Sequence, residues 1–298
     1  MLVSVINLIK FITTHPLNRD DKVKALIRFA KWQIGSRLVS EAVVHEWING
    51  SRFLVKTGET GLTQNIYTGL HEFADMAFLL HFLRREDLFV DVGANAGSYT
   101  ILACAAIGAR GIAFEPVPGT YKRLVENVHL NHLAEKVKCI NKGLGALEGS
   151  IPFTSESDTT NHALASGEHC DNVVMVEVTS MDAALHDASP ALIKIDVEGY
   201  ETLVLEGAQE TLKKRTLHSV IVELNGSATL YGFDELRILE LMFDHGFKSY
   251  SYDPKARKLI NLDGKNMRSG NTLFVRDESF VVERLRSSPI FSIHGRQF

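Results

Sequence analysis

One stretch, a short apolar run that ends in an acid and a glycine-bounded turn, constrains this chain more than any other. Leu88–Thr100 reads LFVDVGANAGSYT, and helix-forming residues follow at Ile101–Ala106. This pattern predicts a buried strand, a tight loop and the start of a helix. Gly93 and Gly97 carry no Cβ, so the backbone of the loop can pass close to a ligand. Ligands of open α/β sheets bind at the carboxyl ends of such strands.

From Leu88 onward, apolar strand-like segments alternate with helical ones. Strands are predicted at 88–92, 111–115, 136–142, 173–178, 191–196, 219–224, 247–252 and 273–276. Helices are predicted at 98–107, 119–131, 180–186, 201–214 and 233–245. This alternation is typical of an α/β fold, in which helices cover both faces of a mostly parallel sheet. Turn signals at Asp253-Pro254 and Asp263-Gly264 predict a hairpin, and therefore an antiparallel last strand.

The residues before this core have a different pattern. Two helices are expected on either side of a turn at His15–Asn18, and a β-hairpin is expected within Val43–Gly61. We therefore divide the chain into a helical and hairpin extension (1–64), an α/β domain (65–286) and a tail (287–298). Residues 150–172 are polar and suggest a lid or substrate loop.

Bulk properties exclude some classes of protein. The net charge of −4 over 298 residues argues against a nucleic-acid partner, which usually requires a basic excess. The three cysteines form no CxxC pair, so we expect a reducing, cytoplasmic setting. Met1–Ile12 is apolar but too short to span a bilayer, and it lacks the features of a signal peptide.

The second expected helix, within Asp21–Leu38, carries five basic residues among apolar ones. Helices of this kind most often expose a solvated face and pack the other face on the protein. The alternative is contact of a basic amphipathic helix with an anionic membrane surface. Association with a second copy of the chain also stays open.

The loop after the first strand distinguishes between two nucleotide-like cofactors. A dinucleotide site expects G-x-G-x-x-G, whereas this loop has Asn95 where the middle glycine would lie. The carboxylate of Asp91 would repel a pyrophosphate but attract the ammonium and sulfonium groups of S-adenosylmethionine (SAM). Glu115, about twenty residues later, ends the next strand and can accept hydrogen bonds from both ribose hydroxyls.

These residues occur in a wider pattern. The runs are FVDVGANAGSYT (89–100), FEP (114–116), KIDVEGYE (194–201) and LEGA (205–208). In these runs the chain resembles the FkbM family of SAM-dependent methyltransferases, within the Rossmann-like methyltransferase superfamily. The resemblance covers about residues 65–224. It implies a seven-stranded mostly parallel sheet with an antiparallel last strand and helices on both faces.

The resemblance also implies roles for individual residues. Asp91, Gly93, Asn95 and Gly97 would hold the methionine part of SAM, and Glu115 its ribose. Residues 141–143 fall where the family contacts adenine, although no acid is present there. The full predicted cofactor-binding set is Glu72, Asp91, Gly93, Asn95, Gly97, Ser98, Tyr99, Glu115, Pro116, Asn141, Gly143 and Asp196.

A hydroxyl acceptor must lose its proton, so the site also needs a general base. The candidates are Asp196, Glu198, His71 and His162. Asp196 and Glu223 could instead hold Mg²⁺, which would acidify the hydroxyl. Each of these residues also has a structural interpretation: Asp196 could bond backbone amides, Glu198 could pair with Lys194 or cap a helix, and His162 could be a surface residue.

The expected function is therefore SAM-dependent methyl transfer, to a hydroxyl of a small-molecule or saccharide acceptor. One alternative is a nicotinamide-dependent oxidoreductase, which the glycine spacing disfavours. The other is a non-catalytic SAM-binding module, which the intact acids at positions 91, 115 and 196 disfavour.

Overall fold

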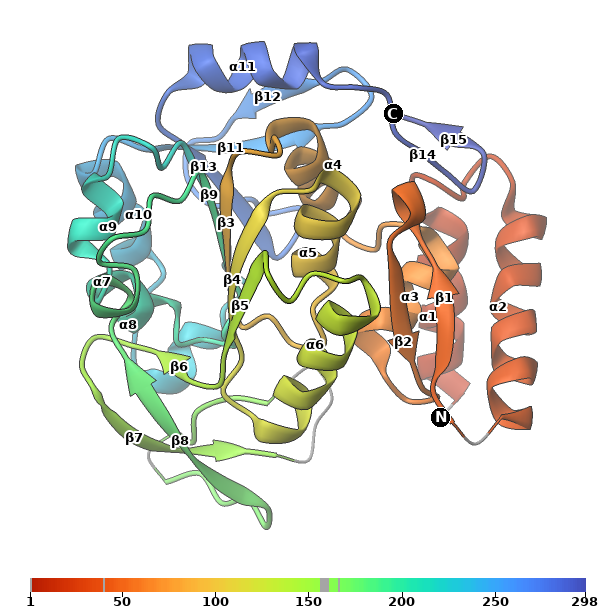
Figure 1. The fold of residues 1–298 in the computed structure, drawn as a ribbon, viewed down its shortest axis with the longest axis horizontal. Helices are drawn as coiled ribbons and strands as arrows, with labels where there is room; N and C mark the ends of the chain where they lie inside the picture. Colours follow the sequence, from red (N-terminus) through yellow and green to blue (C-terminus); the bar gives the residue numbers. More distant parts are fainter. Residues whose placement is uncertain (1, 40, 156–160, 166) are drawn as a thin grey trace.

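A large sheet forms the centre of the protein (Figure 1). The computed structural model describes residues 2–39, 41–155, 161–165 and 167–298, and within them this sheet has eight strands. In spatial order they are β12 (Lys258–Asn261), β11 (Lys248–Asp253), β13 (Asn271–Val275), β10 (Ser219–Glu223), β9 (Leu192–Ile195), β3 (Leu88–Val92), β4 (Arg110–Phe114) and β5 (Val137–Ile140).

The directions of the strands confirm the predicted fold class. The strands β10, β9, β3, β4 and β5 run parallel to one another. The last strand, β13, is antiparallel to both of its neighbours, β10 and β11. The predicted hairpin adds β12 as an edge strand, antiparallel to β11. The carboxyl ends of the parallel strands therefore meet at one edge of the sheet.

Helices cover both faces of the sheet, and every residue of β3 and β9 is buried as a result. One face is covered by α4 (Phe73–Phe82), α5 (Ser98–Ile101), the π-helix η2 (Leu102–Ile107) and α6 (Pro118–Leu130). The other face is covered by α7 (Met181–Ala184), α8 (Glu201–Glu206), α9 (Gln209–Lys213) and α10 (Leu236–Asp244).

One predicted strand lies outside the large sheet. The strand predicted at 173–178 forms as β8 (Val173–Thr179), but in a separate three-stranded sheet between β6 (Gly143–Leu144) and β7 (Gly149–Thr154). Three residues of β8 are exposed and one is half-buried, whereas the strands at the centre of the large sheet are fully buried. Part of the expected polar loop is therefore strand β7, and residues 156–160 and 166 lie outside the described residues.

The helices differ from expectation at two points. The helix expected over 201–214 breaks at Gly207, where a Cβ would lie 2.1 Å from the carbonyl oxygen of Gly145. The helix expected over 98–107 changes from α to π geometry at Leu102. Three further helices were not expected from the sequence: α3 (Thr60–Thr68), the 3-10 helix η3 (Ser227–Tyr231) and α11 (Glu278–Ser287).

The N-terminal segment forms the two expected helices and the expected hairpin. These are α1 (Leu2–Thr14), α2 (Lys22–Leu38), β1 (Val43–Glu46) and β2 (Arg52–Val55), with a 3-10 turn, η1 (Ile48–Gly50), between the two strands. In Figure 1 they lie beside the layer of α4 and α6, with α2 outermost. The helix α3 runs across residue 64, where the extension was expected to end.

The tail folds back onto the helical layer. It forms a small hairpin of β14 (Ser292–Ile293) and β15 (Arg296–Gln297). The ring of Phe298 packs edge-on against Phe73, 5.4 Å between centroids, and also contacts His81. Among the described residues, no helix is long and apolar enough to cross a bilayer.

Candidate active site

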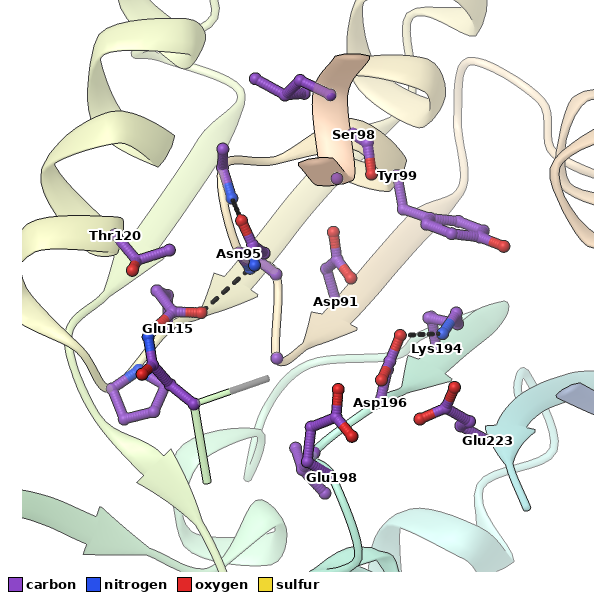
Figure 2. A pocket seen from close by; sticks show the side chains of 18 of the residues that line it. Asp91, Asn95, Ser98, Tyr99, Glu115, Thr120, Lys194, Asp196, Glu198 and Glu223 are labelled. Carbon is purple, nitrogen blue, oxygen red and sulfur yellow. Dashed lines mark hydrogen bonds and ion pairs between the residues drawn. The ribbon is translucent and has the colours of Figure 1, made fainter. Parts of the chain in front are cut away.

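A pocket lies at the carboxyl ends of β3, β4, β9 and β10 (Figure 2). Twelve residues predicted from the sequence line it: His71, Glu72, Asp91, Gly93, Asn95, Ser98, Tyr99, Glu115, Pro116, Asp196, Glu198 and Glu223. They come from segments up to about 150 residues apart, which the parallel strand order brings to one edge.

The loop after β3 passes very close to the end of β9. A Cβ on Gly93 would lie only 1.8 Å from the carbonyl oxygen of Asp196, and the φ of Gly93 is 77°. The amides of Gly93 and Ala94 both donate to the carbonyl of Phe114, at 3.0 and 2.9 Å. Only glycine fits this position, and the loop is anchored to two strands at once.

Asp91 is the penultimate residue of β3, beneath this loop. Its carboxylate accepts a 2.6 Å hydrogen bond from the Thr100 hydroxyl. Burial raises the pKa of Asp91 to about 6, although the hydrogen bond from Thr100 opposes this shift. The side chain lines the pocket and is therefore available to a cationic ligand.

Glu115 follows β4 on the other side of the loop. Its Oε2 accepts a 3.0 Å bond from the amide of Asn95 (Figure 2). Its Oε1 accepts a 3.0 Å bond from the amide of Val117. Burial raises the pKa of Glu115 to about 7 against these two bonds. Each oxygen keeps a second lone pair for a further donor in the pocket.

A buried lysine neutralises part of the acidic floor. The Nζ atom of Lys194 lies 2.8 Å from Oδ2 of Asp196 and 5.0 Å from the ring centroid of Tyr99. Burial would lower the pKa of Lys194, but the charges of Asp196 and Glu72 outweigh burial and raise it. The lysine is therefore a permanent cation in the floor of the pocket.

Three carboxyl groups converge beside this lysine. One oxygen atom from each of Asp196, Glu198 and Glu223 lies within 4.8 Å of the other two (Figure 2). Burial favours the protonated form of Asp196, but Lys194 and a hydrogen bond from Glu223 lower its pKa. Burial and the charge of Asp196 raise the pKa of Glu223 to about 9, so Glu223 keeps its proton at neutral pH.

Glu198 differs from its two neighbours in charge and in backbone geometry. Burial, followed by the charge of Asp196, raises its pKa to about 7. Its φ of 54° lies in the left-handed region, which costs a residue other than glycine of the order of 1 kcal/mol. Backbone strain of this kind is concentrated at functional sites. Glu198 can therefore exchange a proton near neutral pH.

The geometry around His71 determines its tautomer. The Asn65 amide donates to the carbonyl of Gly61 at 3.2 Å, and Asn65 Oδ1 accepts from the backbone amide of His71 at 3.0 Å. His71 Nδ1 lies 3.3 Å from this same Oδ1 and must donate to it. Burial lowers the pKa of His71, so Nε2 is a neutral acceptor, 3.7 Å from Oε2 of Glu72.

Glu72 is held at both carboxylate oxygens. The Tyr99 hydroxyl donates to Oε2 at 2.7 Å, and the Asn271 amide donates to Oε1 at 2.6 Å. Asn271 lies on β13 and is buried. The beginning of α4, the helix α5 and the antiparallel strand β13 are therefore joined at the wall of the pocket.

The sequence of the core matches a known family model. Residues 91–249 match the methyltransferase FkbM domain, which is more than half of the chain. The chain belongs to this family. The FkbM match includes the end of β3 and all of β4, β9 and β10, whose carboxyl ends build the pocket. It decides in favour of the methyltransferase interpretation over the oxidoreductase one.

Two curated relatives are named as methyltransferases. The chain is 29% identical over 152 residues to the hexuronic acid methyltransferase AglP of Haloferax volcanii; the match covers 49% of this chain and 59% of AglP. It is 26% identical over 172 residues to the methyltransferase sdnD of Sordaria araneosa, covering 46% of this chain and 66% of sdnD. In each case the match spans less than two thirds of the relative.

Two solved methyltransferase structures align with this chain at lower sequence identity. The methyltransferase FkbM from Methylobacillus flagellatus aligns with a TM-score of 0.44 and 15% identity over 85% of this chain and 60% of that chain. A precorrin-6Y C5,15-methyltransferase from Geobacter metallireducens aligns with a TM-score of 0.38 and 12% identity over 69% and 86%.

Four residues predicted for the site do not line this pocket. Gly97 has a φ of 94°, which favours glycine, and a Cβ at this position would lie 2.8 Å from Cδ1 of Leu124. Asn141 donates to the carbonyls of Glu115 and Pro116, and Gly143 lines an adjoining pocket with Pro116. The ring of His162 contacts Glu168 at 2.9 Å.

The other residues that line the pocket were not predicted from the sequence. They are Gly61, Leu62, Gln64, Ala94, Ala96, Thr120, Phe153, Asn161, Lys194 and Val197. Lys194 was expected to pair with Glu198, but it pairs with Asp196. In the run Ile193–Asp196, apolar and charged residues alternate. A lysine inside a strand that is otherwise apolar and fully buried is the signal that could have pointed to Lys194.

Proposed function

We propose that this FkbM methyltransferase transfers a methyl group from SAM to a hydroxyl of a small-molecule or saccharide acceptor. The observation that supports this proposal most is the division of the pocket into two acidic sides. Asp91 and Glu115 flank the glycine loop, and Asp196, Glu198 and Glu223 lie together at the end of the neighbouring strands.

The side at the glycine loop fits the cofactor. Glu115 presents buried carboxylate oxygens already oriented by the amides of Asn95 and Val117, as recognition of two adjacent hydroxyls requires. Asp91 and Glu72 supply negative charge for the ammonium and sulfonium groups. SAM, when bound, supplies a methyl group on a positively charged sulfur. These residues hold and orient that group, which is most of the catalytic task in a displacement at carbon.

The other side fits the acceptor. Glu198 takes the hydroxyl proton, because its pKa of about 7 lies close to the working pH. Asp196 is held ionised by Lys194, and Glu223 keeps its own proton, so both orient the acceptor by hydrogen bonds. The acceptor side is rich in hydrogen-bonding groups, which suits a saccharide, and the relative AglP is named for a hexuronic acid.

Binding and turnover test the two halves of this proposal separately. Calorimetry should show that S-adenosylhomocysteine (SAH) binds and that NADH does not. Transfer of a labelled methyl group from SAM should then be measured on a panel of uronic acids and other sugars. Absence of SAH binding to the folded protein would refute the cofactor proposal.

The role of Glu198 needs its own variants. Glu198→Gln should lower kcat about 100-fold or more, with SAH affinity unchanged. Glu210→Gln, an exposed change on α9, should turn over like the native protein. If His71→Gln loses turnover while Glu198→Gln retains it, the base is His71 and our assignment is wrong.

A further inference from the structure

The outward face of α2 is apolar, which is unusual for a helix at the surface of a protein. Val23, Ile27, Ile34 and Leu38 are 68%, 48%, 64% and 81% exposed. Their spacing, with Ala30 between them, places them in one stripe along the helix. Nine of the nineteen exposed large apolar side chains among the described residues lie within 5–39.

The opposite face of α2 accounts for its packing on the protein. Ala25 is buried, and Phe29 packs edge-on against Tyr67 with 5.1 Å between centroids. Arg28 donates to the carbonyl of Tyr67, and Gln33 donates to the Tyr67 hydroxyl at 2.8 Å. The exposed stripe is therefore not needed to hold α2 in place, and it presents apolar surface to the exterior.

Basic residues line both edges of this stripe. At 100° per residue, Lys24 and Lys31 fall on one side of it, and Lys22 and Arg37 on the other. The helix has no acidic residue in a chain whose net charge is −4. Asp21, just before the helix, pairs with Lys24. Positive charge is thus concentrated on one element of an acidic protein.

We propose that the outer face of α2 docks on a membrane surface that contains anionic lipid. The apolar stripe would enter the boundary between headgroups and acyl chains, while the basic edges contact the phosphates. A second copy of the chain fits less well, because two such faces would bring like-charged edges together.

Docking in this way would orient the pocket relative to the membrane. The helix α3 packs on α2 through Tyr67, and its residues Leu62 and Gln64 line the pocket. The thickness of two helices, α2 and α3, roughly 20 Å, therefore separates the docking face from the pocket. An acceptor held at the membrane surface would approach the protein beside this wall.

Vesicle co-sedimentation of the full chain tests the proposal. The protein should sediment with phosphatidylcholine vesicles that contain about 30 mol% phosphatidylglycerol, and not with phosphatidylcholine alone. Raising the salt from about 0.1 M to about 0.5 M should reduce binding severalfold. Ile27→Glu/Ile34→Glu should abolish it. Lys22→Glu/Lys31→Glu should weaken it more than tenfold, since each basic residue contributes about fivefold.

Matched variants control for general effects of the substitutions. Ile260→Glu/Met267→Glu and Lys255→Glu/Lys258→Glu place the same changes at exposed positions remote from α2, and they should bind vesicles like the native protein. Equal binding to both kinds of vesicle, or native binding by the α2 variants, would overturn the proposal. So would a native dimer that Ile27→Glu/Ile34→Glu converts to a monomer, because the face would then be an interface between copies.

Discussion

At the scale of single residues, Gly93 lies where the loop after β3 comes closest to β9. Gly93→Ala should destabilise the protein by about 3 kcal/mol, because its Cβ would meet the backbone of Asp196 at 1.8 Å. Urea unfolding would measure this. Gly50→Ala is a matched control, with a similar φ of 76° but no atom within 4 Å of the new Cβ, and should cost about 1 kcal/mol. Equal losses would contradict the close-approach argument.

The three converging carboxyls are also a test of metal dependence. Lys194 already supplies a positive charge 2.8 Å from Asp196, and Glu223 keeps its proton, which makes it a poor ligand for a cation. We therefore predict that methyl transfer survives dialysis against EDTA. Activity that is lost on chelation and restored by added Mg²⁺ would show instead that the three oxygens within 4.8 Å hold an ion.

At the scale of elements, α6 ties the hairpin to the cofactor loop through one side chain. Asn127 accepts from the amide of Leu54 on β2 at 2.7 Å and donates to the carbonyl of Ala96 at 2.8 Å. Asn127→Ala leaves both groups unpaired, so unfolding free energy should fall by about 2–3 kcal/mol, and SAH affinity should weaken. Lys122→Ala, exposed on the same helix, serves as control. Native stability and affinity in Asn127→Ala would contradict this link.

At the scale of the whole molecule, buried acids should make stability depend on pH. Burial raises the pKa of Asp75, Glu115, Glu198 and Glu201 to about 7, whereas in the unfolded chain they ionise near 4. The folded state therefore binds more protons, and stability falls as pH rises through 7. Buried histidines with lowered pKa oppose this trend, but only below about 6.5, where the unfolded chain binds their protons.

We therefore predict that Tm falls steadily from about pH 6.5 to pH 8 in the absence of ligand. Asp75→Asn should make this decline shallower, because it removes one of the buried acids. Asp244→Asn, at an exposed position on α10, should leave the slope unchanged. A Tm that rises over this interval would mean that these acids are ionised in the folded protein.

The site residues that could be placed from the sequence lie at the ends of strands. Asp91, Glu115 and Asp196 could be placed together because each ends or follows a parallel strand, and parallel strands end at one edge. The sheet to which Val173–Thr179 belongs could not be predicted in this way, because the residues of a strand do not specify its pairing partner. This strand pairs with β7, which lies about twenty residues earlier in the chain, and not with the large sheet. The pocket wall from α3 and the contact of Asn271 with Glu72 depend on packing between segments distant in sequence.

The buried ammonium of Lys194 has a consequence for an enzyme that handles an alkylating cofactor. An amine without its proton is a good nucleophile, and such an amine next to a reactive methyl group would itself be alkylated. The carboxylates around Lys194 raise its pKa and so favour the protonated form, in which the nitrogen has no free lone pair. In a protein that binds SAM here as proposed, the same charges that hold the floor of the pocket together would also protect the lysine from methylation.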